Sequence, residues 1–398
     1  MFNLNSFSIS SLPQIEFGAG SIDKLPSIID GYGKKVLLVT GASSFIESAS
    51  WKALEKVFSQ YQFTYSLCPI MTEPSPDLID ELVQDYKQQS IDVVVAIGGG
   101  SALDAGKAIA GLLRLDHSVM DFLEGVGPEL NYQGPAVPFI AVPTTAGTGS
   151  EATKNAVLSV QAYDGFKKSF RDQQLIPDYA IIDPDLLSTC SQSLIAANGM
   201  DALTQLMESY VSSRSNAMTD ALALSGIEAL SEALLPWYQG DNSNENRSKM
   251  AYASLLSGIN LAQTGLGSVH GLASPLGAFF PIPHGTVCGT LVAEATAVNI
   301  AAMKNRDADN SALQKYAHLG RLLANDSELS DDQSHQSLLD ILYDWTEKMD
   351  LPYLKEYGIR IDHLEHIVGN SRGSSMQTNP IVLTDDEIRN IVFKRLSR

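Results

Sequence analysis

Cysteine is scarce in this sequence. Its 398 residues include three cysteines, Cys68, Cys190 and Cys288, which lie far apart. An odd and widely spaced set excludes a disulfide framework and favours a reducing compartment. We interpret each cysteine as a small buried hydrophobic residue rather than a reactive thiol.

Positive charge and long apolar runs are also lacking. Lysine and arginine number 27 against 46 aspartates and glutamates, which gives a net charge of −19. Such a chain repels nucleic acid and anionic lipid, so neither is expected as a partner. No run of about 18 apolar residues predicts a membrane-spanning helix. The first residues also lack the basic and apolar segments of a signal peptide, so we expect a cytoplasmic protein.

The first half of the chain alternates strand-like and helix-like segments. Short apolar runs rich in β-branched residues predict strands, and residues 77–89 show the apolar spacing of a helix. The predicted strands cover residues 35–40, 91–97, 139–143 and 179–183. This alternation is typical of βαβ units and a parallel sheet.

The character of the chain changes after Asp183-Pro184. Long stretches rich in Ala, Leu, Met and Ser follow, and residues 221–238 and 250–262 predict helices, the first ended by Pro236. Residues 240–248 and 325–337 are predicted to be polar loops. We therefore predict an α/β domain over residues 1–185 and an all-α domain over residues 186–398.

Two glycine-containing loops follow predicted strands. In the first, Gly98-Gly99-Gly100-Ser101 opens a probable helix, where glycines let the backbone approach a phosphate and free N–H groups can bind it. This is not the GxGxxG fingerprint, and a tight strand-to-helix turn is the alternative. The second loop, residues 142–151, gathers threonines and glycines. Two such loops at the carboxyl ends of parallel strands favour a phosphate-bearing cofactor.

Asp201, His270 and His284 form a candidate metal site. One carboxylate and two imidazoles suit a divalent ion of borderline softness, Fe²⁺ or Zn²⁺, better than calcium or magnesium. Gln205 lies one helical turn after Asp201, so it can address the same ion. A histidine there would complete a four-ligand set, whereas a glutamine is a weaker donor.

Six motifs in order resemble those of the iron-containing, or group III, alcohol dehydrogenases. They are GGGSALDAGKAIA, PTTAGTGSEAT, the DP of IIDPDLL, GMDALTQLMESYVSS, HGLASPLGAF and PHG. The resemblance covers essentially the whole chain. It implies an N-terminal Rossmann-like α/β domain and an all-α C-terminal domain, an architecture shared with dehydroquinate synthase, and commonly a homodimer.

The resemblance also implies roles for individual residues. Asp201, His270 and His284 match metal ligands. Residues expected to contact NAD or NADP are Gly99, Gly100, Ser101, Asp104, Thr144, Thr145 and Thr148.

Three positions depart from the common family pattern. Gln205 stands where many members have a histidine ligand. Ser274 replaces a histidine that many members have near the nicotinamide, so Ser274 or a water chain must relay protons. Gly41 stands where NAD-preferring members often have an aspartate. Glycine removes the repulsion of a 2′-phosphate, and Ser43 and Ser44 could donate hydrogen bonds to it, so acceptance of NADP is predicted.

The sequence therefore predicts a metal-dependent enzyme that transfers hydride between a primary alcohol, or its aldehyde, and NAD(P). Oxidation of the terminal hydroxyl of an acidic sugar such as 3-deoxy-manno-octulosonate is an alternative. A lyase of the dehydroquinate synthase type and a non-catalytic homologue without metal are alternatives of other classes.

Overall fold

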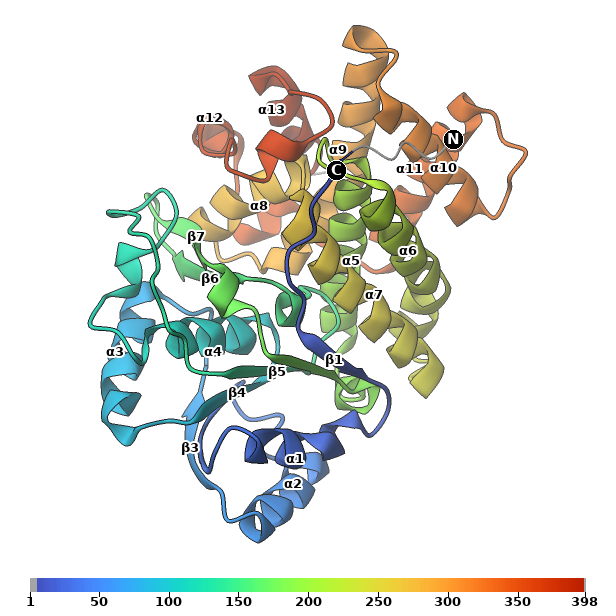
Figure 1. Ribbon diagram of the computed structural model, residues 1–398. Helices are drawn as coiled ribbons and strands as arrows, with labels where there is room; N and C mark the ends of the chain where they lie inside the picture. The colour runs from blue at the N-terminus through green and yellow to red at the C-terminus, as the bar shows by residue number, and fades with distance from the viewer. Residues whose placement is uncertain (1–5, 397–398) are drawn as a thin grey trace. The chain divides into compact units, whose positions relative to one another are not determined.

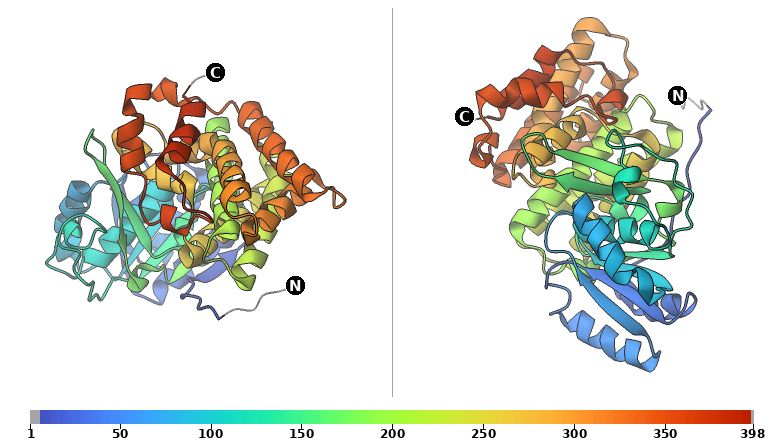
Figure 2. Two further views of the ribbon diagram at one scale, coloured as in Figure 1. Left: turned by 90° about the horizontal axis from the view of Figure 1, so that it is seen from above. Right: turned by 90° about the vertical axis from the view of Figure 1, so that its left-hand side faces the viewer.

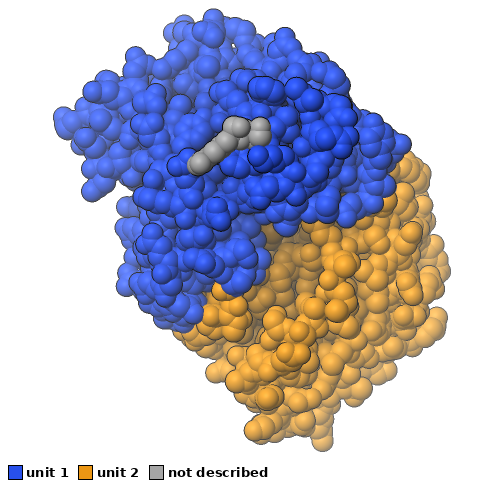
Figure 3. All heavy atoms as spheres, turned by 180° about the vertical axis from the view of Figure 1, so that it is seen from behind, with its two compact units in different colours: residues 1–9, 161–166, 191–398 blue, residues 10–160, 167–190 orange. Residues whose placement is uncertain are grey.

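The computed structural model describes residues 6–396. The chain divides into two compact units (Figure 3). Unit 2 comprises residues 10–160 and 167–190, and unit 1 comprises residues 1–9, 161–166 and 191–398.

Unit 2 is built on a parallel sheet (Figure 1). Its strand order is β1-β8-β5-β4-β2-β3, and every pairing is parallel. The strands are β1 (Gln14–Phe17), β2 (Lys35–Thr40), β3 (Thr64–Pro69), β4 (Val93–Gly98), β5 (Phe139–Pro143) and β8 (Tyr179–Ile182). Because β3 lies on one side of β2 and β4 on the other, the winding direction reverses between β2 and β4. Open α/β sheets bind ligands at such a reversal.

The four predicted strands are confirmed as β2, β4, β5 and β8. β1 and β3 complete the sheet and were not predicted. Both are edge strands whose side chains are mostly exposed or half-buried, so they lack the apolar run that marks a buried strand. β6 (Asn155–Val160) and β7 (Phe166–Arg171) form a separate two-stranded sheet that was not predicted either.

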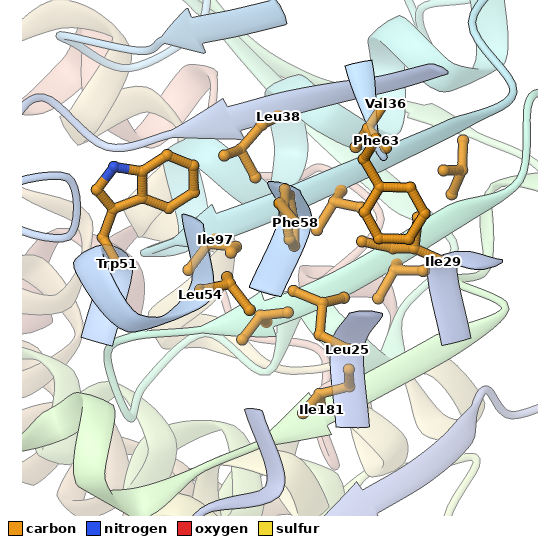
Figure 4. Packing of buried hydrophobic residues seen from close by; sticks show 14 of the residues in the cluster. Leu25, Ile29, Val36, Leu38, Trp51, Leu54, Phe58, Phe63, Ile97 and Ile181 are labelled. Atoms are coloured by element: carbon orange, nitrogen blue, oxygen red, sulfur yellow. The ribbon is translucent and has the colours of Figure 1, made fainter. Parts of the chain in front are cut away.

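Helices cover both faces of the sheet. On one face, α1 (Leu25–Asp30) and α2 (Ala49–Gln60) contribute Leu25, Trp51 and Phe58 to an apolar cluster with alternate residues of the strands (Figure 4). On the other face lie α3 (Pro76–Tyr86), which confirms the predicted helix, and α4 (Gly100–Leu112). A Cβ at Gly106 of α4 would lie 2.8 Å from Ala96 Cβ, so glycine lets α4 pack directly on β4.

The described part of unit 1 from residue 191 onward is helical, coloured from green to red in Figure 2. Its helices are α5 (Gln192–Val211), α6 (Ala217–Tyr238), α7 (Asn244–Thr264), α8 (Ser268–Phe279), α9 (His284–Arg306), α10 (Ser311–Ala324), α11 (Asp331–Lys348), α12 (Leu364–Gly369) and α13 (Asp385–Lys394). α5 packs against α6, α7 and α9 and is buried without interruption from Gly199 to Val211. The predicted combination of an α/β domain and an all-α domain is confirmed.

Three local predictions in unit 1 were wrong. α6 ends at Tyr238, as the predicted range 221–238 does, but Pro236 does not end it: the helix continues for two more residues, and Gln239 N bonds Leu235 O. The predicted loop at 240–248 becomes helical at Asn244, where Ser243 caps α7. The predicted loop at 325–337 becomes helical at Asp331, where Ser330 and Gln333 form a capping box.

One helix of the described chain, α9, is long and apolar enough to cross a membrane. However, 89% of its apolar window is buried inside the protein, which is typical of a core helix. Its apolar character is therefore explained by packing within unit 1.

Candidate metal centre and cofactor-binding loops

The structure brings Asp201, His270 and His284 together from three different helices. Asp201 lies on α5, His270 on α8, and His284 is the first residue of α9. His270 Nε2 lies 3.3 Å from Asp201 Oδ1, and His284 Nε2 lies 3.9 Å from the same atom. With Cys288 Sγ, one donor atom from each residue lies within 4.8 Å of all the others. We call these four residues the Asp201 cluster.

The carboxylate of Asp201 is fully buried. The residue is 0% exposed, and neither carboxylate oxygen accepts a hydrogen bond from the described residues. Burial opposes its ionisation, yet the neighbouring His284 and His270 lower the pKa of Asp201 to about 2. A buried carboxylate without donors is costly unless a cation compensates it. The donor types, their spacing and the unsatisfied oxygens therefore fit a divalent metal ion.

Glu208 orients one of these histidines, a role that the sequence analysis missed. Its Oε2 lies 2.7 Å from His270 Nδ1, and its Oε1 accepts a hydrogen bond of 2.7 Å from Val269 N. A proton on Nδ1 leaves Nε2 free to bind a metal, as in other carboxylate–histidine–metal arrangements. Glu208 lies seven residues after Asp201 on α5, and this two-turn spacing was the available signal.

Cys288 is the second residue that the sequence analysis missed. It is buried as expected, but its Sγ lies 3.6 Å from His270 Nε2 and 3.8 Å from His284 Nε2. Burial raises the pKa of the Cys288 thiol to about 12, so the protein by itself keeps the thiol protonated at neutral pH. The signal in the sequence was its position four residues after His284, one turn along the same helix.

Gln205 and Ser274 lie on the helices that carry these residues. Gln205 is 3% exposed, and its Oε1 accepts a hydrogen bond of 2.9 Å from Ser257 Oγ on α7. Ser274 is half-buried on α8, one turn after His270. A ligand role for Gln205 and a proton-relay role for Ser274 stay predictions.

The two predicted cofactor loops touch one another in unit 2. Gly99 precedes α4 without a side-chain cap, and a Cβ there would lie 3.4 Å from the Thr145 side chain. A Cβ at Gly100 would lie 2.9 Å from Thr148 Cγ2, and Thr144 N donates to Gly98 O at 2.9 Å. A side chain at Gly100 would push Thr148 away, whereas one at Gly99 would make ordinary contact with Thr145. The two loops thus form one surface at the carboxyl ends of β4 and β5.

A buried lysine supports this pair of loops. Lys107 of α4 is 0% exposed, and its Nζ donates to Ser150 O (2.8 Å), Ser150 Oγ (3.1 Å), Thr153 Oγ1 (3.0 Å) and Asn155 O (2.6 Å). Asp104 Oδ1 accepts a hydrogen bond from Ser150 Oγ and lies 3.8 Å from Lys107 Nζ, and its predicted contact with the cofactor stays a prediction. Burial lowers the pKa of Lys107 to about 8.

Glu151 completes this group. It is 2% exposed, and burial raises its pKa to about 7 despite the opposing effects of a backbone hydrogen bond and of Lys107. We call Asp104, Lys107, Ser150, Glu151 and Thr153 the Lys107 cluster. The sequence analysis treated this stretch only as a loop and missed the lysine that anchors it.

Gly41 lies at the point where the sheet reverses direction. It follows β2, and a Cβ at neighbouring Gly98 would lie 3.1 Å from Gly41 N. A Cβ at Gly41 would have no atom within 4 Å, and Ser43 and Ser44 are exposed. The predicted NADP-related residues therefore sit at the ligand-binding end of the sheet, with open space at Gly41.

Comparisons with known proteins agree with this arrangement. Residues 13–184 match the family model described as iron-containing alcohol dehydrogenase, and residues 195–396 match its C-terminal counterpart. Alcohol dehydrogenase 4 of Saccharomyces cerevisiae is 30% identical, over 96% of this chain and 97% of that protein. The NAD-dependent methanol dehydrogenase of Bacillus methanolicus is also 30% identical, over 96% of this chain and 98% of that protein.

A solved iron-containing alcohol dehydrogenase from Thermotoga maritima is 28% identical, with a TM-score of 0.82 over 98% of this chain and 99% of that one. Two family models that cover both units, together with near-complete relatives, establish the assignment. The chain belongs to the iron-containing alcohol dehydrogenase family, and it is a metal-dependent and NAD(P)-dependent enzyme acting on alcohols or aldehydes.

Proposed function

We propose that this enzyme interconverts a primary alcohol and its aldehyde at the Asp201 cluster. The proposal rests mainly on one observation. His270 and His284 lie beside the carboxylate of Asp201, and its oxygens accept no hydrogen bond from the described residues. A relative that covers nearly the whole chain is a methanol dehydrogenase, which supports a primary alcohol as substrate.

The residues divide the chemistry between them. A divalent ion at this cluster would act as a Lewis acid toward a hydroxyl or carbonyl oxygen. The nicotinamide cofactor carries the hydride. Asp201, His270 and His284 supply the charge and geometry of the site, and Glu208 fixes the ring of His270. The Ser274 hydroxyl, one turn from His270, is our candidate for passing a proton between substrate and water.

A substrate panel tests this proposal. Short and long primary alcohols, their aldehydes and 3-deoxy-manno-octulosonate are assayed with NAD and NADP, before and after chelation and with iron or zinc added back. We expect turnover of at least one primary alcohol, lost on chelation and restored by metal. Turnover of the acidic sugar alone would replace the simple alcohol as the substrate class. Turnover that survives complete metal removal would contradict the proposed site.

We further propose that NADP is accepted, and that Gly41 permits it. The position has room for a larger group, and exposed serines follow at 43 and 44. A carboxylate at this position would repel the 2′-phosphate, at a cost of a few kcal/mol at close range.

Gly41→Asp tests the role of this position. Because a Cβ at Gly41 meets no atom within 4 Å, the variant should fold normally. We expect kcat/KM for NADP to fall about 10- to 100-fold while that for NAD changes little. Gly41→Asn, which has the same shape without the charge, is the matched control and should retain NADP. An equal loss of kcat/KM with NAD and NADP in Gly41→Asp would show that the residue at this position does not discriminate by the 2′-phosphate.

A further inference from the structure

We propose that Cys288 Sγ is the fourth protein ligand of the metal, in place of the side chain at position 205. The proposal rests on the metal-dependent function proposed above and specifies its ligand set. The centre is then formed by one carboxylate, two imidazoles and one thiolate, from Asp201, His270, His284 and Cys288. Binding of the divalent ion displaces the thiol proton of Cys288, which is released to solvent.

The distances around Cys288 match those of a four-coordinate site. Tetrahedral zinc places nitrogen and oxygen donors about 3.3 Å apart, and nitrogen and sulfur donors about 3.6 Å apart. Here His270 Nε2 lies 3.3 Å from Asp201 Oδ1 and 3.6 Å from Cys288 Sγ. His284 Nε2 lies 3.9 Å from the same carboxylate oxygen and 3.8 Å from the same sulfur. One donor atom from each of the four residues lies within 4.8 Å of all the others, so a single ion can be reached by all four.

The burial of Asp201 and Cys288 separates this cluster from a chance approach of a cysteine to a histidine. Asp201 and Cys288 are both 0% exposed, and the carboxylate oxygens of Asp201 accept no hydrogen bond from the described residues. The sulfur and a carboxylate oxygen of Asp201 lie within 4.8 Å of each other and of the two histidine donors. A cation among these donors satisfies the carboxylate and the sulfur together.

The side chain at position 205 is engaged elsewhere. Oε1 is the only atom of a glutamine side chain that can bind a metal, because the amide nitrogen has no available lone pair. In Gln205 this oxygen lies 2.9 Å from Ser257 Oγ, whose single hydroxyl hydrogen is shared between it and Ser254 O at 2.8 Å. Gln205 is therefore tied to α7.

The two changes compensate one another across the site. In the family pattern described above, the fourth ligand is a histidine one turn after Asp201 on α5. In this chain that imidazole is missing, and a thiol stands one turn after His284 on α9. The i, i+4 ligand pair has moved from one helix to the other, and the number of protein ligands stays at four.

A thiolate changes which metal the site prefers. Sulfur is a softer donor than an imidazole or an amide oxygen, and mixed cysteine–histidine–aspartate sets favour zinc. We therefore infer that the purified enzyme binds zinc more tightly than iron(II).

Cobalt(II) substitution tests the ligand directly. A cobalt–sulfur bond produces a ligand-to-metal charge-transfer band in the near ultraviolet, whereas nitrogen and oxygen ligands give only the visible cobalt bands. We expect the band in the cobalt-loaded full-length enzyme and its disappearance in Cys288→Ser, with the visible bands retained. Cys68→Ser and Cys190→Ser are matched controls and should keep the band.

Metal affinity gives a second measurement. By chelator competition, Cys288→Ser should bind zinc at least about 100-fold more weakly, a loss at least as large as those seen for supporting residues. Gln205→Ala should keep both the affinity, within a few fold, and the charge-transfer band. Circular dichroism confirms that each variant is folded, and serine is close in size to the cysteine it replaces.

The outcomes separate this proposal from the proposed function. Metal-dependent turnover without a charge-transfer band overturns the thiolate ligand and leaves the function standing. Loss of metal in Gln205→Ala, with zinc affinity unchanged in Cys288→Ser, assigns the fourth position to Gln205 and overturns the proposal. Failure of the native protein to bind zinc, iron(II) or cobalt(II) overturns both.

Discussion

The Lys107 cluster and the Asp201 cluster are both built from ionisable side chains in the interior, but only one is complete. Lys107 Nζ is bonded to four acceptors from the loop and hairpin that it supports. The carboxylate oxygens of Asp201 accept no hydrogen bond from the described residues, although the residue is equally buried.

This difference separates a structural cluster from a ligand site. Buried polar groups in proteins are normally hydrogen-bonded, so an unsatisfied one calls for an explanation such as a missing ion. The Lys107 cluster holds residues 150–155 against α4 with side chains of its own. In the Asp201 cluster, the carboxylate faces His270 and His284, whose ring nitrogens are themselves metal donors. Four changes test this contrast.

Lys107→Met should have the largest effect. It removes a fully buried cation that lies 3.8 Å from Asp104 Oδ1 and donates hydrogen bonds to Ser150, Thr153 and Asn155. Breaking a buried ion pair in this way costs about 3–5 kcal/mol of the free energy of unfolding. Urea denaturation measures the loss. Lys24→Met, at an exposed pair with Glu16, is the control and should change the free energy by less than about 1 kcal/mol. A similar small change in both variants would show that the Lys107 cluster does not stabilise the fold.

Metal removal should act on the Asp201 cluster alone. A ligand that binds only the folded state at 100 times its Kd stabilises it by about 2.7 kcal/mol. We therefore expect chelation to lower the free energy of unfolding by about this amount under those conditions. Asp201→Asn should unfold identically with and without zinc, whereas Lys107→Met should retain its response to zinc. Equal responses in the native protein and Asp201→Asn would place the metal elsewhere.

Protons, rather than metal, should modulate the Lys107 cluster. The pKa of Glu151 is raised from 4.5 to about 7 in the folded state. Between pH 4.5 and pH 7, the folded protein therefore keeps the Glu151 proton, whereas the unfolded chain has lost it. Its contribution to stability is fully present below pH 4.5 and is lost as the pH rises through 7. Between pH 5 and pH 7, the native protein should lose roughly 2 kcal/mol more than Glu151→Gln, in which the group cannot ionise. Parallel pH profiles for the two proteins would contradict the shift.

Glu208→Gln should lower the metal affinity of the Asp201 cluster without abolishing metal binding. The amide can still accept from Val269 N, but its NH₂ group cannot accept the proton on His270 Nδ1. Loss of such a supporting carboxylate lowers metal affinity about 10- to 100-fold. Chelator competition measures the change, and Glu228→Gln, at an exposed position on α6, is the matched control. Unchanged affinity in Glu208→Gln would remove this residue from the site.

Several features of the fold followed directly from the sequence. The runs at 35–40 and 139–143 predicted β2 and β5 at the bounds found, because a buried parallel strand is apolar throughout. The edge strands β1 and β3 were not predicted because most of their side chains are exposed or half-buried, so their sequences are not continuous apolar runs. Helix starts were misplaced where polar residues act as caps, as at Ser243 and Ser330, since the same residues are also typical of loops.

The sequence by itself determined the class of the two units, the family, and the three residues Asp201, His270 and His284, because local periodicity and ordered motifs are properties of the chain alone. Only the tertiary structure decided the neighbours of those residues. It brought Cys288 and Glu208 to His270, tied Gln205 to Ser257, and enclosed Lys107. The physical reason is that a side chain's partners depend on how helices far apart in the sequence pack, and residue type alone does not distinguish a buried hydrophobic cysteine from a metal ligand.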